Sequence, residues 1–355
     1  MIIQHLEAEN YRNIRRCVII PQNGINIIYG KNAQGKTNLL EAVWLFTGGR
    51  SFRGTKDADL ILQGEAGAKL SLEFFSGERE QTAEITIENG RRNAVLNGIP
   101  QKNASGLVGK FFSVIFSPEH IALVREGPSQ RRDFMDAALC QIKPGYAALL
   151  SRYHHTLIQR NTLLKDIPRH AELMDTLEIW DEKLASYGEA IVLGRMDYIR
   201  KIKEPVKEIY AGISQHTEII DLTYQKSAED MKKALKAARR EDVALGHTSV
   251  GPHRDDIDIA IDLRSARTFG SQGQKRSAVL ALKLAEAEML YSQTGERPVV
   301  LLDDVMSELD SGRQDYLLNH LDRCQVFITC CEPGAIQQLR EGALFEMDGG
   351  TLIKK

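Results

Sequence analysis

The stretch IIYGKNAQGKTNLLEA, residues 27–42, decides the fold. An apolar run typical of a buried strand leads into a short loop, and apolar residues then recur at helical spacing. The segment from Gly30 to Thr37 matches GxxxxGK[ST], and the motif requires the strand before it and the helix after it. A chance match over eight residues is therefore the weaker interpretation, and we predict a phosphate-binding loop.

Each part of this loop has a predicted role in holding a triphosphate. Glycines let the backbone wrap closely, so that N–H groups point at phosphate oxygens, and the following helix adds the positive end of its dipole. The Lys36 ammonium would reach the β- and γ-phosphates, and the Thr37 hydroxyl would bind Mg²⁺. We therefore expect ATP and Mg²⁺ as cofactors. The predicted ATP contacts are Gly30, Lys31, Asn32, Ala33, Gln34, Gly35, Lys36, Thr37 and Asn38, with Arg12 as a further candidate.

A second motif, VVLLDD at residues 299–304, follows about 260 residues later. Its four apolar residues predict a buried strand that ends beside the phosphate loop, where Asp303 would hold Mg²⁺. Asp304 would orient or activate the attacking water, so Asp304 and Lys36 are the predicted catalytic residues. The alternative, a strand that ends in a solvated acidic turn, would be common without the first motif.

The chain between these two motifs changes character. Alternating apolar and polar residues over 69–100, with Asn-Gly dipeptides at 89–90 and 97–98, predict an antiparallel β-meander. From about residue 118 to 244 glycine becomes rare, and two apolar series with 4-3-4-3-4 spacing predict two antiparallel helices that form an arm. An ordinary helical bundle would show the same spacing. Pro205 should end or kink the second helix.

The segment SQGQ, residues 271–274, opens the helix that precedes the acidic strand. Taken alone it is a simple helix cap. The order of phosphate loop, SxGQ, acidic strand and SELD (residues 307–310) resembles the ABC-type ATPases. In that class the SxGQ of one subunit closes over the γ-phosphate held by another, so the resemblance implies an ATP-dependent homodimer. The implied trans contacts to ATP are Ser271, Gln272, Gly273, Gln274 and Asp310.

Further segments narrow the resemblance to the SMC-like branch, in which helical arms separate the two nucleotide motifs. NYRNI at 10–14, the PE, GP and RR pairs within 118–132, VGPHRDD at 250–256 and LLDDVMSELD at 301–310 look like the RecF family of bacterial recombination mediators. The implied fold is α/β: an ABC-type P-loop ATPase head, with a mixed sheet and the β-meander, and an inserted helical arm domain. The expected parts are 1–117 (head), 118–244 (arm) and 245–355 (head).

The resemblance also implies a function in DNA replication and recombinational repair. An ATP-induced dimer would clamp duplex DNA at gaps and at single-strand/double-strand junctions. With RecR and RecO it would promote RecA loading and SOS induction, and slow ATP hydrolysis would release it. Any enzymatic activity would be a weak DNA-dependent ATPase. An ATPase subunit of a transporter is the alternative, and a small-molecule P-loop kinase is a weaker third, because SxGQ and SELD have no function there.

Three positions depart from the general ABC pattern or leave it open. Asp304 stands where those enzymes usually have Glu, which implies slow hydrolysis, and ITCCEP at 328–333 lacks the histidine often found after the last strand. Glu119 is the nearest candidate for the usual glutamine relay before the arm. His253 and Arg254 could line the nucleotide site, but we favour a structural turn.

A net charge of −2 means that any DNA site must be a local patch. The first candidate is the glycine-rich loop GGRSFRGTK, and the second is a basic cluster on a predicted helix near 232–240. Apart from Phe52 in the loop, neither is interleaved with aromatic residues, so we expect backbone contacts without base stacking. A solvated basic surface is the alternative for each. The predicted DNA contacts are Arg50, Arg53, Lys56, Lys232 and Lys236.

The remaining composition argues for the cytoplasm. Five cysteines without zinc-binding spacing favour reduced thiols. The N-terminal MIIQHLEAEN lacks the basic start and apolar core of a signal peptide, and no apolar run is long enough to cross a bilayer. We therefore expect a cytoplasmic protein without a membrane partner.

Overall fold

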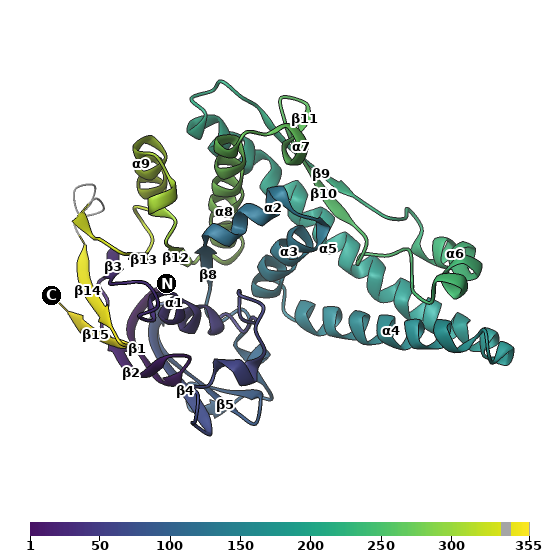
Figure 1. Ribbon diagram of the computed structural model, residues 1–355, viewed down its shortest axis with the longest axis horizontal. Helices are drawn as coiled ribbons and strands as arrows, with labels where there is room; N and C mark the ends of the chain where they lie inside the picture. The colour runs from purple at the N-terminus through teal and green to yellow at the C-terminus, as the bar shows by residue number, and fades with distance from the viewer. Residues whose placement is uncertain (335–341, 355) are drawn as a thin grey trace. The chain divides into compact units, whose positions relative to one another are not determined.

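Figure 1 shows a computed structural model of the chain, which describes residues 1–334 and 342–354. The chain forms two compact units, which we call the head unit and the arm unit. The head unit comprises Met1–Ile121, Pro205–Glu218 and Arg276–Lys355, and the arm unit comprises Ala122–Glu204 and Ile219–Lys275.

The first sheet of the head unit is antiparallel, with strand order β2-β1-β4-β5-β6-β7. It contains the predicted meander, and both Asn-Gly pairs have the positive φ angles that a tight two-residue turn requires (50° and 68°, then 50° and 75°). The meander is therefore confirmed. The strands of the whole sheet are β1 (Ile2–Tyr11), β2 (Ile14–Ile19), β4 (Gly67–Ser76), β5 (Arg79–Glu88), β6 (Arg91–Leu96) and β7 (Ile99–Pro100).

The second sheet of the head unit is mixed, with order β15-β14-β3-β13-β12-β8. β13 lies between β3 and β12 and pairs with both in parallel. The carboxyl ends of these three strands therefore share one edge of the sheet, which is where ligands bind in such sheets. The strands are β3 (Ile25–Tyr29), β8 (Ser113–Phe116), β12 (Val299–Asp303), β13 (Val326–Cys330), β14 (Ala343–Asp348) and β15 (Thr351–Lys354).

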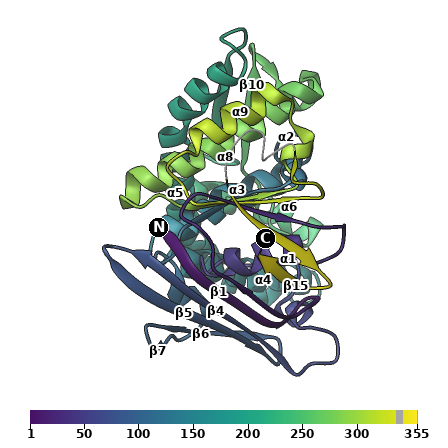
Figure 2. The same cartoon turned by 90° about the vertical axis from the view of Figure 1, so that its left-hand side faces the viewer.

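Helix α1 (Lys36–Leu45) lies between the two sheets, as Figures 1 and 2 show, and contacts β1 on one side and β8, β12 and β13 on the other. Its apolar side chains Leu39, Leu40 and Val43 are fully buried, which fixes the loop before it against the sheet edge. The unit also contains α9 (Ser311–His320), most of α8 (Gln272–Thr294), and 3₁₀ helices at Asp57–Leu60, Ala104–Leu107, Pro118–Ile121 and Met306–Glu308.

The arm unit contains α4 (Tyr146–Asp166) and most of α5 (Leu177–Ile213), which are the predicted pair of helices and run antiparallel in Figure 1. Leu164, Ile167 and Leu177 form a buried cluster where the two helices are joined. The other helices are α2 (Ala122–Arg125), α3 (Pro128–Ile142), α6 (Met231–Leu245) and α7 (Ala266–Phe269), with a 3₁₀ helix at Ala171–Thr176.

Pro205 is predicted to end or kink α5. The helix does not end there but continues to Ile213, the kink stays a prediction, and the two units divide at this residue. The stretch predicted to be helical also contains a strand, β9 (Ile220–Gln225), in a sheet of order β11-β10-β9 with β10 (Asp256–Ile261) and β11 (Arg264–Ser265). Its first residues alternate between buried and less buried positions, which is the strand signal that the helix-rich composition concealed.

Candidate nucleotide site

The loop between β3 and α1 requires glycine at two positions. Gly30 has φ +152°, and a Cβ there would lie 2.3 Å from the carbonyl oxygen of Met347. Gly35 has φ +112°, and its Cβ would lie 2.9 Å from Oδ1 of Asn13. Any side chain at either place would therefore strain the backbone and force a neighbour to move. The two glycines are fixed by their surroundings as well as by the motif.

Polar contacts from two other turns hold this loop in shape. Nδ2 of Asn13 donates to the carbonyl of Ala33 at 3.0 Å, and its Oδ1 accepts from Asn38 at 2.7 Å. Gln34 accepts from the backbone N–H of Gly349 at 2.6 Å through its side chain. Asn13 was not a predicted site residue. NYRNI supports the family resemblance, but no local pattern tells which of its residues touches the loop.

Lys36 is buried at the start of α1. Its Nζ donates to the carbonyl oxygens of Gly30 at 2.7 Å and Lys31 at 3.0 Å. The ammonium therefore folds back over the phosphate loop. An ammonium has three donors, and the third remains for an anion. The helix N-terminus adds further positive potential at the same place.

Thr37 and Asp303, which the sequence assigns to one metal site, are in contact. The hydroxyl of Thr37 donates to Oδ1 of Asp303 at 2.8 Å, and the hydroxyl of Thr329 donates to the same oxygen at 2.8 Å. The predicted meeting of phosphate loop and acidic strand is therefore present. Thr329 was missed, and the only sequence signal for it is a polar residue inside the buried strand QVFITC.

Burial raises the pKa of Asp303 above its ordinary value, and the nearby charge of Asp304 raises it further, while the hydrogen bonds from Thr329 and Thr37 lower it. Hydroxyl and carboxylate oxygens side by side are the hard ligands that Mg²⁺ prefers. The pair therefore fits a magnesium ion.

Asp304 follows the strand in a left-handed conformation with φ +52°. Its backbone N–H donates to Oγ1 of Thr329 at 3.0 Å, so one hydroxyl positions both aspartates. Aspartate is one of the few non-glycine residues that adopt this conformation readily, because its short polar side chain can hydrogen-bond locally.

Arg12, predicted to contact ATP, lies in an ion pair. Its Nε and one terminal nitrogen donate to the buried carboxylate of Glu41 at 2.8 and 2.9 Å, and it also bonds Thr55. Tyr11 donates to the same carboxylate at 3.0 Å. In the described structure Arg12 thus compensates the charge of Glu41.

The SxGQ segment begins α8 with a capping box. The backbone N–H of Gln274 donates to Oγ of Ser271 at 3.2 Å, and the N–H of Ser271 donates back to Oε1 of Gln274 at 2.7 Å. Ser271 and Gln272 are exposed, whereas Gly273 and Gln274 are half-buried. Asp310 caps α9 by accepting from the N–H of Arg313 at 3.0 Å. Both predicted trans elements therefore sit at helix N-termini, where backbone donors accumulate.

Glu119 lies in the 3₁₀ turn that follows β8, and it is exposed. Its N–H donates to Oγ of Ser117 at 3.2 Å, and Nδ1 of His120 accepts from the N–H of Ser117 at 3.0 Å. The turn is thus held locally and leaves the Glu119 carboxylate at the surface.

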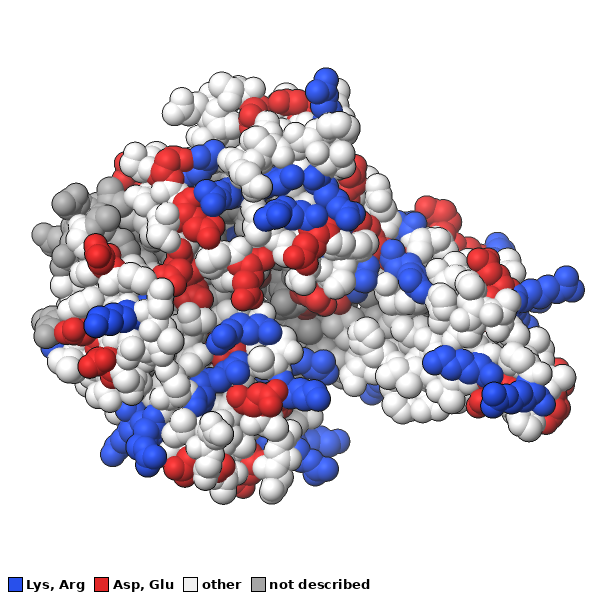
Figure 3. Space-filling model, in the orientation of Figure 1, with Lys and Arg blue, Asp and Glu red and all other residues white. Residues whose placement is uncertain are grey.

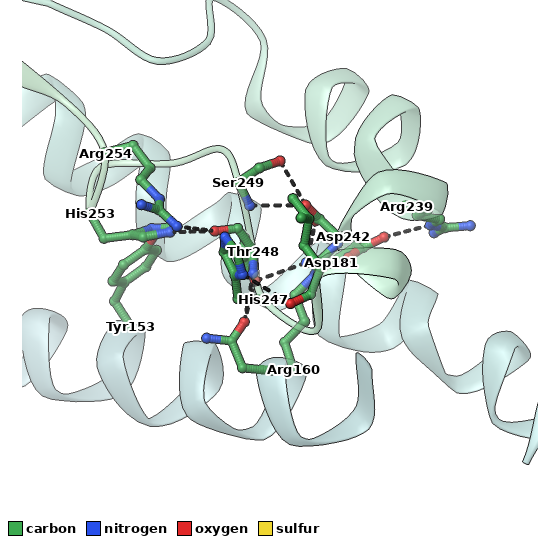
Figure 4. Close-up of polar contacts among 12 residues, drawn as sticks. Tyr153, Arg160, Asp181, Arg239, Asp242, His247, Thr248, Ser249, His253 and Arg254 are labelled. Atoms are coloured by element: carbon green, nitrogen blue, oxygen red, sulfur yellow. Dashed lines mark hydrogen bonds and ion pairs between the residues drawn. The ribbon is translucent and has the colours of Figure 1, made fainter. Parts of the chain in front are cut away.

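The GPHRDD segment is a structural turn in the arm unit, as we favoured. His253 lies between the Tyr153 hydroxyl, 2.6 Å from Nδ1, and the carbonyl of Thr248, 3.1 Å from Nε2, as Figure 4 shows. Burial lowers the pKa of His253 to about 4, so the ring is neutral at pH 7. Arg254 also donates to the carbonyl of Thr248, at 3.3 Å.

The predicted DNA contacts lie in different environments. Arg50, Arg53 and Lys56 are exposed in the head unit, and Arg53 donates to Oδ1 of Asn38 at 3.0 Å, close to the phosphate loop. On α6, Lys232 is exposed but ion-paired with Glu182 at 2.8 Å, and Lys236 is exposed. The ion pair with Glu182 neutralises part of the positive charge on α6 that the sequence predicts would be available to DNA.

Residues 1–334 and 342–354 contain neither a disulfide nor a membrane-spanning helix. All five cysteines are free thiols, as predicted. Over residues 1–334 and 342–354, no cluster of three or more His, Cys, Asp or Glu side chains could hold a metal ion, and no helix is long and apolar enough to cross a membrane. A magnesium site at Thr37 and Asp303 would thus draw the rest of its ligands from nucleotide and solvent.

Comparisons with known proteins now decide the family. The model of the RecF/RecN/SMC N-terminal domain matches residues 2–349. The DNA replication and repair protein RecF of Acetivibrio thermocellus is 41% identical over 345 residues, covering 94% of each chain. The chain belongs to the RecF family. The RecF of Agathobacter rectalis is also 41% identical, over 93% of this chain and 92% of its own.

Solved structures agree with this family assignment. A structure titled as the recombination mediator protein RecF with ATPrS in the RecFOR pathway matches with a TM-score of 0.92 and 39% identity, over 99% of this chain and 97% of that one. The Smc head domain of Pyrococcus furiosus matches with a TM-score of 0.58 at 17% identity, which shows a shared fold only. The predicted ABC-type head with helical arm is therefore confirmed, and the transporter alternative is not favoured for a RecF-family chain.

Asp303→Asn should separate magnesium binding from folding. Asn keeps an acceptor oxygen for Thr37 and Thr329 but lacks the charge that burial penalises. Because the folded-state pKa of Asp303 is raised, its ionisation opposes folding as pH rises through that pKa. We expect the variant to have a thermal midpoint at pH 7 no lower than that of the parent, together with loss of magnesium-dependent ATP binding.

Calorimetry and titration with a fluorescent ATP analogue, each with and without Mg²⁺, measure both effects. A lower midpoint with intact binding would contradict the assignment.

Proposed function

We propose that this chain is an ATP-dependent DNA-binding protein of recombinational repair. The observation that carries the proposal is the contact between Thr37 of the phosphate loop and Asp303 of the acidic strand, because it unites the two halves of a nucleotide site from opposite ends of the chain. Relatives named DNA replication and repair protein RecF, and the structures titled RecF-ATP and RecF-ATPrS, support it.

In this proposal the loop from Gly30 to Asn38 holds ATP. The Lys36 ammonium neutralises the terminal phosphates, and Thr37 and Asp303 hold Mg²⁺. When bound, the ion would neutralise charge that develops on the phosphates. Asp304 orients the attacking water, and its short side chain makes hydrolysis slow. ATP therefore acts as a timed switch in a weak, DNA-dependent ATPase.

Nucleotide binding joins two copies of the chain. Ser271 and Gln272 are exposed at the start of α8, and Asp310 is exposed at the start of α9. Backbone N–H groups gathered at a helix start bind anions, and the dipole favours negative charge there. We propose that these residues, with Gly273 and Gln274, complete the ATP site of the second copy. Without nucleotide the dimer lacks its bridging phosphates and separates.

The joined copies clamp duplex DNA through its backbone, with Arg50, Arg53 and Lys56 as the first contacts. Binding should fall steeply with salt, because each neutralised phosphate releases counterions. In the cell this clamp would act at gaps with RecR and RecO and favour RecA loading. The membrane has no part in this function.

The proposal is tested by retention of duplex DNA in gel filtration. The parent chain with ATP and Mg²⁺ should co-elute with duplex DNA as a dimer, and Lys36→Met, which lacks the ammonium, should retain none. The parent chain without nucleotide is the matched control. Equal retention by parent and variant, or ATP-independent retention by the parent, would contradict an ATP-driven clamp.

A further inference from the structure

A group of cations and exposed apolar side chains lies on the arm unit, around α2, β11 and α7. Helix α7 packs against α2, β10 and β11, so these elements adjoin one another. Lys and Arg side chains gather over α2 and α7 in Figure 3. We call this surface the α2–α7 patch; its cations are Arg125, Arg264, Arg267 and Lys275, and its apolar members are Ile219, Leu263 and Phe269.

The positive charge of the α2–α7 patch is not neutralised. Within the part of the chain that the structure describes, none of its four cations has a carboxylate at ion-pair distance, and residues 263–276 contain no acid. The cluster on α6 differs, because Lys232, Lys233 and Arg239 each pair with an acid at 2.7–3.0 Å. The α2–α7 patch is therefore the better electrostatic partner for a polyanion.

The apolar members of the patch contribute little to the fold. Leu263 is 98% exposed and has φ +64°, following Asp262 at φ +49°, so a leucine occupies the left-handed tip of the β10–β11 turn. That conformation is unfavourable for a leucine, and no burial offsets it. Ile219 is 71% exposed and joined to this turn by the hydrogen bond from the N–H of Asp262 to its carbonyl, 2.9 Å long.

Phe269 ends α7, two residues before SxGQ, and 67% of its surface is exposed. Phe269 shares α7 with Arg267, and α7 contacts the strand β11 that carries Arg264. An exposed ring on an element rich in cations is the combination that binds unpaired nucleic acid, since bases stack on the ring while cations follow the backbone. In a duplex the base faces are hidden, so the ring adds nothing there. The basic cluster on α6 has no such ring, and Phe52 of the GGRSFRGTK loop is half-buried in an edge-to-face contact with Trp44.

We propose that the α2–α7 patch binds the single-stranded part of gapped DNA. Phe269 stacks on a base, the four cations contact phosphates, and Leu263 covers the exposed end of the base stack where the duplex stops, as apolar wedges do at opened steps. This rests on the proposed DNA-binding function and deepens it: the patch supplies the preference for a junction over plain duplex.

A second copy of the chain is the competing occupant, because the patch lies close to SxGQ in the sequence. Arginine and aromatic residues also occur at protein interfaces, but cations buried there need acidic partners, and the patch itself supplies none. The unneutralised charge of the patch therefore favours DNA over a protein surface, and the experiment below separates the two.

The experiment measures fluorescence anisotropy of labelled oligothymidylate, blunt duplex, and duplex with a single-stranded tail. Phe269→Ser should weaken oligothymidylate binding about tenfold, the effect of losing one stacked base, and leave blunt duplex nearly unchanged. Leu263→Gly suits the left-handed turn, so its thermal midpoint should be no lower than that of the parent, yet it should lose the preference for tailed duplex. Arg264→Ala with Arg267→Ala should weaken binding and flatten its salt dependence.

Matched controls lie on α4 of the same unit. Ile158→Ser removes a 62% exposed apolar side chain, and Arg152→Ala removes an exposed cation. Both should bind oligothymidylate as the parent does. The proposal is overturned by Phe269→Ser binding within twofold of the parent, by an equal loss in Ile158→Ser, or by Phe269→Ser losing only the ATP-dependent dimer, which would assign the patch to self-association.

The outcome is distinguishable from failure of the proposed function. The oligothymidylate titration is repeated without nucleotide and in Lys36→Met, where no ATP-driven dimer is expected. If the parent chain showed no ATP-dependent retention of duplex DNA, the proposed clamp would be wrong. The oligothymidylate titration would still measure single-strand binding by the patch. Nucleotide-independent binding that depends on Phe269 would support the patch on its own.

Discussion

Ser271→Arg is expected to bind ATP as tightly as the parent chain and to remain monomeric at nucleotide concentrations that dimerise the parent. The hydroxyl of Ser271 accepts from the N–H of Gln274 in the exposed first turn of α8. Arginine removes this cap, which costs about 1 kcal/mol locally, and places a long side chain where the γ-phosphate held by the second copy must approach. We expect the dimer dissociation constant to rise at least a hundredfold.

Light scattering after gel filtration, with a fluorescent ATP analogue to measure affinity, checks this result. Lys36→Ala should show the complementary defect, with neither nucleotide binding nor dimer. Asp304→Asn should bind ATP and persist as a dimer long after the parent has separated. A normal ATP-dependent dimer of Ser271→Arg would exclude the trans contact.

Mixing the two defective variants gives a sharper test. In a heterodimer, one nucleotide site combines the intact Lys36 of one copy with the intact Ser271 of the other, while the second site lacks both. We therefore expect a mixture of Lys36→Ala and Ser271→Arg to recover a weak ATP-dependent dimer with one nucleotide per two chains. Sites built within a single copy would leave the mixture monomeric.

The sequence predicted those features that depend on short-range pattern. The strand, loop and helix around Gly30 follow from residues within one window, and the strand ending in Asp303 follows from its apolar run. Their meeting at Thr37 could be predicted because parallel strands share one edge of a sheet. The Asn-Gly turns of the meander were predictable for the same local reason.

Contacts between distant residues could not be predicted in this way. Thr329 donates a hydrogen bond to Asp303, and Asn13 donates one to the phosphate loop. No sequence motif around either residue predicts its contact. Lys232 read as a free cation because Glu182, its partner, lies 50 residues away. Charge clusters along a sequence therefore overstate the charge that a folded surface presents, and the α2–α7 patch emerged only from exposure and pairing in the structure.

Arg160 is the second position where a large effect is expected, here on stability. It occupies a seam position of α4 and is fully buried. Figure 4 shows its guanidinium between two carboxylates: Nε donates to Asp181 at 2.7 Å, and one terminal nitrogen donates to Asp242 at 2.7 Å and to Thr248 at 2.8 Å. Arg239 donates to the other oxygen of Asp181 at 2.7 Å. This single side chain thus links α4 to α5, α6 and the loop after α6.

Arg160→Met keeps most of the apolar stem but leaves two buried carboxylates without their shared cation. Removing one partner from a buried ionic network costs about 3–5 kcal/mol. We expect urea unfolding, followed by circular dichroism, to show a loss of this size. Arg152→Met, at an exposed position of the same helix, should change the unfolding free energy by less than about 0.5 kcal/mol.

The cause of that loss can be separated into charge and packing. Adding Asp242→Asn to Arg160→Met removes one of the stranded charges while keeping acceptors for Ser249, whose N–H and hydroxyl bond this carboxylate. If charge dominates, the double variant should recover part of the stability, so the second substitution stabilises in the Arg160→Met background although it destabilises the parent. A deficit unrelieved by Asp242→Asn would instead assign the role of Arg160 to packing of its stem.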